Sequence, residues 1–111
     1  MNIQIFGSSK SFDSKKAERW FKERGIRYQY IDLPRYGMSR RELESVRVKV
    51  GLEELINRKS REYEELFIQY ITPGAAEEKI FENPGLLNVP IVRNGREATV
   101  GYRPEIWNTW Y

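Results

Sequence analysis

The residues best suited to chemistry are serines in one short segment, Ser8-Ser9-Lys10-Ser11, followed by Ser14. A polar loop that leads from a strand into a helix presents unpaired backbone N–H groups and the positive end of the helix dipole, so it attracts anions. A serine at such a place is a nucleophile only beside a base, and the chain has no histidine. We therefore expect Ser11 to form a hydrogen bond at the start of a helix rather than to attack a substrate.

The residue types that the sequence lacks exclude further chemistry. Its 111 residues include no cysteine and no histidine, so disulfides, thiol redox chemistry and thiolate metal sites are absent. Without imidazole the chain also lacks the usual base near neutral pH and the commonest zinc ligand, so we expect no metal site. The 19 basic and 16 acidic residues are interspersed, for a net charge of +3. This pattern indicates a solvated surface rather than a nucleic-acid interface.

Length and composition indicate one globular domain over residues 1–111. The hydrophobic fraction is 40% and the aromatic fraction 14%, well above what disordered chains contain. No apolar run approaches the roughly 20 residues that cross a bilayer. The N-terminus lacks the basic and apolar regions of a signal peptide. We therefore expect a cytoplasmic protein without membrane contact.

The elements that position the serines are a strand and a helix on either side of them. Alternating polarity predicts a strand over 2–6 and another over 26–31. Between them, residues 12–24 form a predicted helix with Ala17, Trp20 and Phe21 on one face. Strand, helix and strand within about 30 residues form a βαβ unit, whose strands are parallel.

The rest of the chain is predicted to be a helical block followed by a hairpin. Ser39 and Glu42 have the spacing of a capping box at the start of a helix that runs to about residue 50. Further helices are expected over 52–57, 61–71, 75–82 and 103–111, and a hairpin over 90–100 around Asn94-Gly95, a pair that suits a type I′ turn. Tyr63, Leu66, Phe67 and Tyr70 form an apolar stripe that we expect in the core. Trp107 and Trp110 either face the core as well or belong to an aromatic tail, ending at Tyr111, that docks a partner.

Three motifs in the right order resemble the arsenate reductase/Spx family. They are Ile3-Gln-Ile-Phe-Gly-Ser-Ser-Lys-Ser-Phe-Asp-Ser-Lys-Lys-Ala17, Ile56-Asn-Arg-Lys-Ser-Arg-Glu-Tyr63, and Asn83-Pro-Gly-Leu-Leu-Asn-Val-Pro-Ile-Val92 followed by Val100-Gly-Tyr102. The resemblance implies an α/β, thioredoxin-like fold. A four-stranded mixed sheet with flanking helices is expected, together with a helical insertion over about 38–82.

The resemblance also assigns candidate site residues. Ser11 falls on the position of the family's nucleophilic cysteine and Arg58 on that of an anion-binding arginine, so these two stand at the catalytic positions. Pro90 matches a cis-proline. The family's reductases have arginine where this chain has Val89 and Tyr102, so we do not expect it to reduce arsenate. The oxyanion- or substrate-binding candidates are Ser8, Ser9, Lys10, Phe12, Ser14, Val89, Pro90 and Tyr102.

Three functions remain open at this point. The first is a glutaredoxin-like, thiol-dependent oxidoreductase that is redox-inactive because Ser11 replaces the cysteine, by natural loss or by an introduced Cys→Ser change. Glutathione or another thiol would serve it only with that cysteine present. The second is a non-catalytic module that binds a protein, as the Spx regulators contact RNA polymerase, although those have a longer tail than a chain ending at Tyr111.

The third is passive oxyanion binding by Ser8–Ser11 and Arg58. Its alternative is an empty site with Arg58 paired to a surface carboxylate, and Phe12 lies either exposed at the mouth of the site or in the core.

Overall fold

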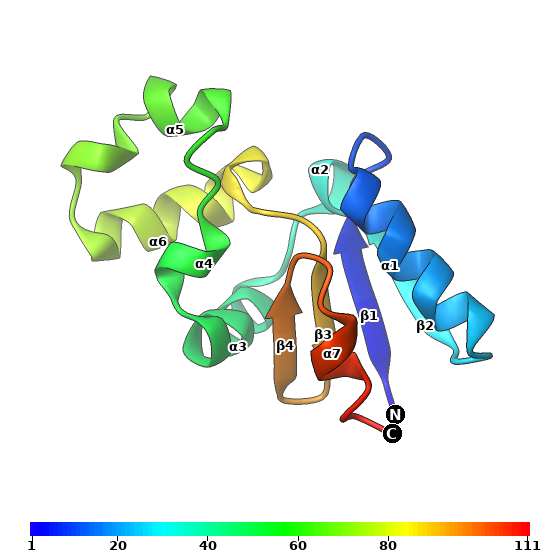
Figure 1. Cartoon of the computed structure of the whole chain (residues 1–111). Coiled ribbons are helices and arrows are strands. Elements are labelled where there is room, and N and C mark those ends of the chain that lie inside the picture. Colours follow the sequence, from blue (N-terminus) through cyan, green and yellow to red (C-terminus); the bar gives the residue numbers. More distant parts are fainter.

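The computed structural model describes all 111 residues and has one four-stranded sheet between two helical layers (Figure 1). The strands are β1 (Ile3–Gly7), β2 (Tyr28–Asp32), β3 (Ile91–Asn94) and β4 (Glu97–Val100), in the order β2-β1-β3-β4. β1 and β2 are parallel, and the other pairs are antiparallel. The sheet is therefore mixed, as the sequence predicts.

Helices cover both faces of the sheet. They are α1 (Phe12–Glu23), α2 (Leu33–Tyr36), α3 (Arg40–Val50), α4 (Leu52–Leu55), α5 (Arg61–Glu65), α6 (Pro73–Glu82) and α7 (Pro104–Trp107), with 3-10 turns η1 (Ile68–Tyr70) and η2 (Pro84–Leu86). Figure 1 shows α1 and α7 on one side and the block from α3 to α6 on the other. That block is the helical insertion expected over about 38–82. None of these helices has the length and apolar character needed to cross a membrane.

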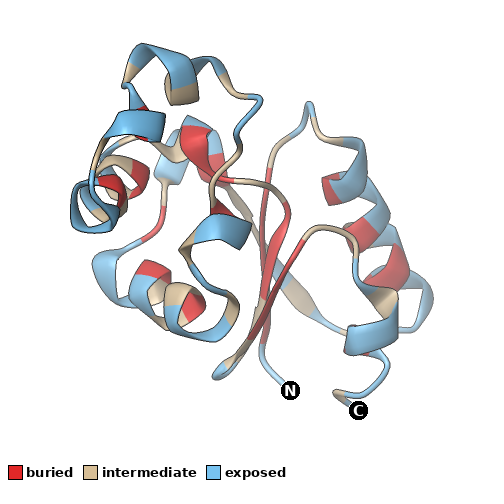
Figure 2. Cartoon of the chain, turned by 60° about the vertical axis from the view of Figure 1, so that its left-hand side comes forward, coloured by how far each residue is buried: buried red, intermediate tan, exposed pale blue.

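The strands β1, β3 and β4 contain all of the buried strand residues, whereas the edge strand β2 has none, and alternate residues of the central strands serve different cores (Figure 2). On β1, Ile3 and Ile5 pack with α1 and α7, whereas Phe6 packs with the helical insertion. Adjacent β3 residues divide the same way, with Val92 in the first core and Ile91 in the second. This follows from the two-residue period of a strand, because successive side chains point to opposite faces.

The helix α1 begins and ends where its sequence predicts. The Ser11 side chain caps it, and Asp13 lies in the first turn, where a negative charge favours the helix dipole. Gly25 follows with a φ of 68°, the left-handed conformation that ends many helices. Trp20 and Phe21 on its inner face are buried, so α1 is held against the sheet by aromatic packing.

The short α7 is anchored by one buried tryptophan. The Trp107 side chain is fully buried, and its indole Nε1 donates to Thr99 Oγ1 on β4 at 2.8 Å. Its ring packs edge-on to Trp20 with centroids 5.4 Å apart. Trp110 packs at the border of the same core and is only half-buried. The predicted inward orientation of Trp107 is therefore confirmed, but the helix ends well before residue 111.

The predicted continuous helix over 61–71 is wrong. The chain leaves α5 at Leu66, takes a left-handed conformation at Phe67 with a φ of 54°, and continues as η1. This break shifts the helical phase, so Ile68 turns inward while Phe67 and Tyr70 are 66% and 78% exposed. Of the expected core stripe only Tyr63 and Leu66 pack against the core.

Two local predictions also need correction. The hairpin turn consists of Gly95 and Arg96, because Asn94 pairs with Glu97 inside the ladder. Gly95 has a φ of 60° and Arg96 has no positive φ, so a type I′ turn is excluded and Gly95 takes the first position, as in type II′ turns. The helix α2 directly after β2 is not among the predicted elements.

A first prediction concerns the hydrogen bond that fixes α7. Thr99→Val preserves the shape of the buried side chain but leaves the Trp107 N–H without an acceptor. We expect the free energy of unfolding in urea to fall by about 1–3 kcal/mol. Thr109→Val is the control, because it removes a hydrogen bond to the Ile106 carbonyl at an exposed position where water can replace the lost partner, and it should change stability by less than about 0.5 kcal/mol. Equal stability of wild type and Thr99→Val would contradict this account of α7.

Candidate functional site

The strand register brings three segments, which belong to two of the three family motifs, to one end of the sheet. Phe6 pairs with Ile91, and Ile91 pairs with Val100. The loop after β1, the segment before β3 and the segment after β4 therefore emerge together. The Gly101 N–H donates to the Pro90 carbonyl at 2.8 Å, which joins the last two segments directly.

The loop after β1 is closed by hydrogen bonds among its own serines. Ser11 Oγ accepts the Ser14 N–H at 3.1 Å, and Ser14 Oγ accepts the Ser8 N–H at 3.2 Å. Ser8 in turn accepts the Lys10 N–H on its hydroxyl at 3.3 Å and the Ser11 N–H on its carbonyl at 3.0 Å. These donors would otherwise be free at a helix start. The loop thus satisfies internally much of the donor capacity that an anion would use.

This arrangement depends on Gly7 at the end of β1. Ser14 is fully buried against it, and a Cβ at position 7 would lie 2.8 Å from Ser14 Oγ, 2.9 Å from Ser14 Cβ and 2.9 Å from the Tyr30 hydroxyl oxygen. Only a residue without a side chain permits this approach. Burial raises the pKa of Tyr30, with smaller contributions from the charges of Glu18 and Asp32. The phenol therefore stays neutral here and offers no base.

The candidates on the other two segments border this loop. Val89 is half-buried, Pro90 is buried, and the peptide bond between them is cis. Tyr102 connects the site to α1, because Lys16 Nζ lies 4.4 Å from the centroid of the tyrosine ring. The ring also packs edge-on to Trp107, with centroids 5.5 Å apart. Tyr102 is thus held in place between the site and the aromatic core.

The outer surface of the loop is formed by Ser9, Lys10 and Phe12. The first two are exposed, and the Phe12 ring is 83% exposed. Of the two placements left open for Phe12, the structure shows the exposed one. A large apolar side chain in water directly beside Ser11 is a feature of contact surfaces more than of a core.

Arg58 lies on the helical insertion, between α4 and α5. Its chain neighbour Asn57 donates its N–H to the Leu86 carbonyl at 2.7 Å, so this segment is tied to the one leading to Pro90. The Arg58 side chain is exposed, forms no hydrogen bond or salt bridge, and lines a small apolar groove of about 170 Å³. No contact joins it to the serine loop, nor is it paired with a surface carboxylate.

The assembled residues offer little for catalysis. Ser11 Oγ has a backbone N–H as its hydrogen-bond partner and no base. No group of three acidic residues, the remaining candidate ligands in a chain without histidine or cysteine, lies close enough to hold a metal ion. The chemistry this end of the sheet supports is binding through exposed side chains.

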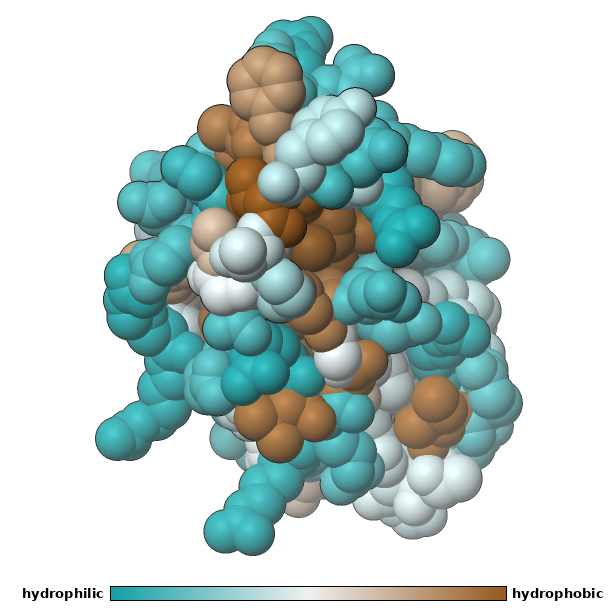
Figure 3. All heavy atoms as spheres, turned by 90° about the vertical axis from the view of Figure 1, so that its left-hand side faces the viewer, coloured by the Kyte–Doolittle hydropathy of each residue, from teal (hydrophilic) through white to brown (hydrophobic).

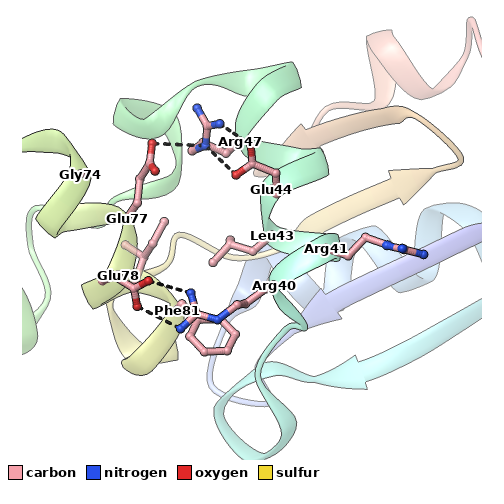
Figure 4. Close-up of a pocket in the computed structure, with 10 residues that line it drawn as sticks. Arg40, Arg41, Leu43, Glu44, Arg47, Gly74, Glu77, Glu78 and Phe81 are labelled. Carbon is pink, nitrogen blue, oxygen red and sulfur yellow. Dashed lines mark hydrogen bonds and ion pairs between the residues drawn. The ribbon is translucent and has the colours of Figure 1, made fainter.

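A cavity of about 470 Å³ between α3 and α6 is absent from the sequence predictions (Figure 4). Arg40 binds both carboxylate oxygens of Glu78, at 2.7 and 3.1 Å, and Arg47 bridges Glu44 and Glu77. The arginines hold the pKa of Glu44 and Glu78 below its usual range through these hydrogen bonds. Most charges that line the cavity are thus neutralised within the protein. The pairs that join α3 to α6 depend on tertiary packing, and no sequence signal marks them.

Comparison with known proteins agrees with this geometry. The sequence pattern described as the ArsC family matches residues 6–110. The global transcriptional regulator Spx 2 of Oceanobacillus iheyensis is 32% identical over 109 residues, which cover 95% of this chain and 80% of the regulator.

Solved structures share the fold. An arsenate reductase from Vibrio cholerae has a TM-score of 0.85 at 24% identity, with 96% of this chain and 94% of that one covered. A putative ArsC family related protein from Bacteroides fragilis has a TM-score of 0.85 at 22% identity over the whole of both chains. The glutaredoxin-like NrdH-redoxin of Escherichia coli has a similar thioredoxin-like fold, with a TM-score of 0.52 at 17% identity over 100% of this chain and 96% of that one.

A second prediction tests the close approach at Gly7. Gly7→Ala forces Ser14 and Tyr30 outward, so we expect a loss of about 1–3 kcal/mol in the free energy of unfolding. Gly74→Ala is the matched control, because a Cβ there meets nothing within 4 Å and position 74 is helical. It should leave stability unchanged or raise it by up to about 1 kcal/mol. Urea titrations in which both variants behave alike would show that position 7 tolerates a side chain.

Proposed function

The chain belongs to the ArsC family, and we propose that it works by binding a regulatory protein partner, without thiol chemistry. One observation carries the proposal. At the position where the resemblance places the family's cysteine, Ser11 is a helix cap whose hydroxyl accepts the Ser14 N–H at 3.1 Å. The position that the resemblance assigns to a reactive thiol therefore stabilises the start of α1 in this chain.

The substitution closes the reaction for an energetic reason. A helix start lowers the pKa of a thiol into the range of about 3.5–7.5, so that a thiolate forms at neutral pH. A serine hydroxyl ionises many pK units higher and needs an adjacent base, which this site lacks. Disulfide exchange requires sulfur outright. Glutathione or another thiol therefore has no group to react with, and no cofactor is proposed.

The case for a protein partner rests on the kind of relative and on the exposed surface. The relative at 32% identity is named as a global transcriptional regulator, which favours a regulatory role. Phe12 is 83% exposed beside Ser11, and exposed aromatic side chains are enriched at protein interfaces. We place this role in the cytoplasm, with no part for nucleic acid or membrane.

The direct test is co-purification from cells of the source organism after brief chemical crosslinking, followed by mass spectrometry. We expect one discrete partner, recovered equally by wild type and Ser11→Ala, because the serine has no catalytic part. Phe21→Ala, which disrupts the core, serves as the unfolded control. The proposal fails if no partner is recovered, and reduction of disulfides by a Ser11→Cys variant with glutathione would then favour the thiol-dependent alternative.

A third prediction asks whether the helix start still has its electrostatic character. In Ser11→Cys the sulfur takes the place of the capping oxygen, so we expect a thiol pKa below about 7.5. Ser9→Cys, on the exposed part of the same loop, is the control and should titrate near 8.5. Absorbance of the thiolate during a pH titration measures both. A value near 8.5 for both variants would show that the site no longer stabilises an anion.

A fourth prediction addresses passive oxyanion binding, the weaker alternative. The serines already occupy the N–H groups of Ser8, Lys10, Ser11 and Ser14, and Arg58 contacts none of them. Millimolar arsenate, phosphate or sulfate should therefore leave the thermal midpoint unchanged relative to chloride at equal ionic strength. A rise in the midpoint that disappears in Arg58→Gln would reverse this conclusion and support an oxyanion pocket.

A further inference from the structure

The helical insertion carries an apolar groove on the face opposite α1. It is lined by Leu52, Ile56, Tyr63, Ile68, Ile71 and Ala76, with Glu53, Arg58, Gln69 and Pro73 completing the lining, and we call it the insertion groove. Figure 3 shows the face formed by the insertion, where a hollowed apolar strip runs between hydrophilic side chains. Together with the exposed Phe67 and Tyr70 nearby, the groove leaves several apolar side chains of the insertion uncovered.

The size of the insertion groove limits what it can hold. Its volume is about 170 Å³, whereas sites for small molecules usually enclose about 300–1,000 Å³. It has room for one or two apolar side chains rather than for a whole metabolite. Protein interfaces use such pockets for the anchor side chains that contribute most of the binding energy.

Two aromatic residues that adjoin the groove residue Ile68 are turned to solvent. Phe67 has a φ of 54° although it is bulky, and its ring is 66% exposed. Tyr70, one turn further along η1, is 78% exposed. The left-handed conformation is rare for such a residue and persists mainly where it serves a function. Because it keeps Phe67 out of the core while Ile68 turns in, it places an aromatic ring near the insertion groove.

The polar side of the insertion groove carries two charged side chains, Arg58 and Glu53, and neither forms a salt bridge. Arg40 and Arg47 are neutralised by glutamates of α3 and α6. Arg58 has no partner, and neither do its neighbours Lys59 and Arg61. Glu53 is the acidic side chain in the lining. An unpaired guanidinium can bind a carboxylate with two parallel hydrogen bonds. This contact is stronger than the one between a carboxylate and an ammonium group.

We infer that the insertion groove docks a segment of the partner protein in which a large apolar residue stands next to Asp or Glu. The apolar side chain enters between Leu52, Ile56 and Ile71, and the carboxylate binds Arg58. The inference rests on the proposed binding function and deepens it, since it adds a second contact surface to the one at Phe12 and names the chemistry of the segment bound there. It assigns Arg58 to protein recognition rather than to an oxyanion site at Ser11.

The test uses the full chain and a displayed library of random 12-residue peptides. We expect the selected peptides to combine a large apolar residue with Asp or Glu within two positions. One selected peptide is then synthesised and titrated calorimetrically into five proteins: wild type, Arg58→Glu, Arg41→Glu, Glu53→Gln and Phe67→Asn. Arg41 is the matched control, because it is an exposed, unpaired arginine of the insertion outside the groove. Figure 4 shows its side chain pointing away from the cavity between α3 and α6.

Arg58→Glu should weaken the peptide at least about tenfold, and exchange of the peptide's acidic residue for Lys should restore binding to that variant. Arg41→Glu and Glu53→Gln should bind like wild type. Phe67→Asn, which suits the left-handed conformation, should weaken binding while its thermal midpoint stays equal or rises. Selection of basic peptides, loss of binding in Glu53→Gln, or equal binding by wild type and Arg58→Glu would overturn the inference.

Two further outcomes would also overturn it. If sedimentation shows that wild type dimerises and Phe67→Asn does not, the occupant is a second copy of this chain. If Arg58→Glu still co-purifies the cellular partner at the wild-type level, the groove is the wrong surface although the binding function stands. Recovery of no partner by any variant would instead be a failure of the proposed function itself.

Discussion

The contact of Ser14 with Gly7 holds together the end of the sheet where the family motifs meet. Since position 7 has no side chain, the first turn of α1 can approach β1 until Ser14 is fully buried and its hydroxyl accepts the Ser8 N–H. Few backbone N–H groups of the loop then remain free to bind an anion. The Ser11 hydroxyl accepts a further one, the Ser14 N–H. The strand register places the cis Val89–Pro90 bond and Gly101 beside this loop. The serine loop, the cis peptide bond and Gly101 therefore form one connected backbone arrangement around Ser11.

The protein's two cores divide its surface into regions with different character. The core of α1 and α7 is dominated by interlocking aromatic rings around Trp107, and it supports the closed serine loop. The core under the helical insertion is aliphatic and is covered by short helices, so apolar surface remains at its edge. Short helices gain little stability from their own hydrogen bonds and depend on packing. The surface of the insertion is thus the part of the protein that can best adapt to a partner, whereas the sheet and α1 keep their conformation.

The sequence predicted those features that depend on local signals. The capping serine of α1, the Ser39–Glu42 capping box and the alternating strands are all present, because each is set by residues a few positions apart. The break at Phe67 was not predicted, since an apolar stripe at helical spacing continued through it and only packing of Ile68 explains the change. The insertion groove was missed for the same reason, because its lining comes from four separate segments. The motif assigned Arg58 to an anion site beside Ser11, but the structure shows no hydrogen bond or salt bridge between them, because the packing of the short helices sets the position of Arg58.

The central claim is that this member of the family acts by binding, with Ser11 as a structural cap. The most direct measurement is the affinity of the purified cellular partner for wild type and for Ser11→Ala, by calorimetry at equal ionic strength. The account predicts equal dissociation constants, because the capping hydroxyl touches only its own loop. A loss of affinity of about tenfold or more in a Ser11→Ala protein with unchanged circular dichroism would contradict it, and would show that the hydroxyl at the cysteine position takes part in the function.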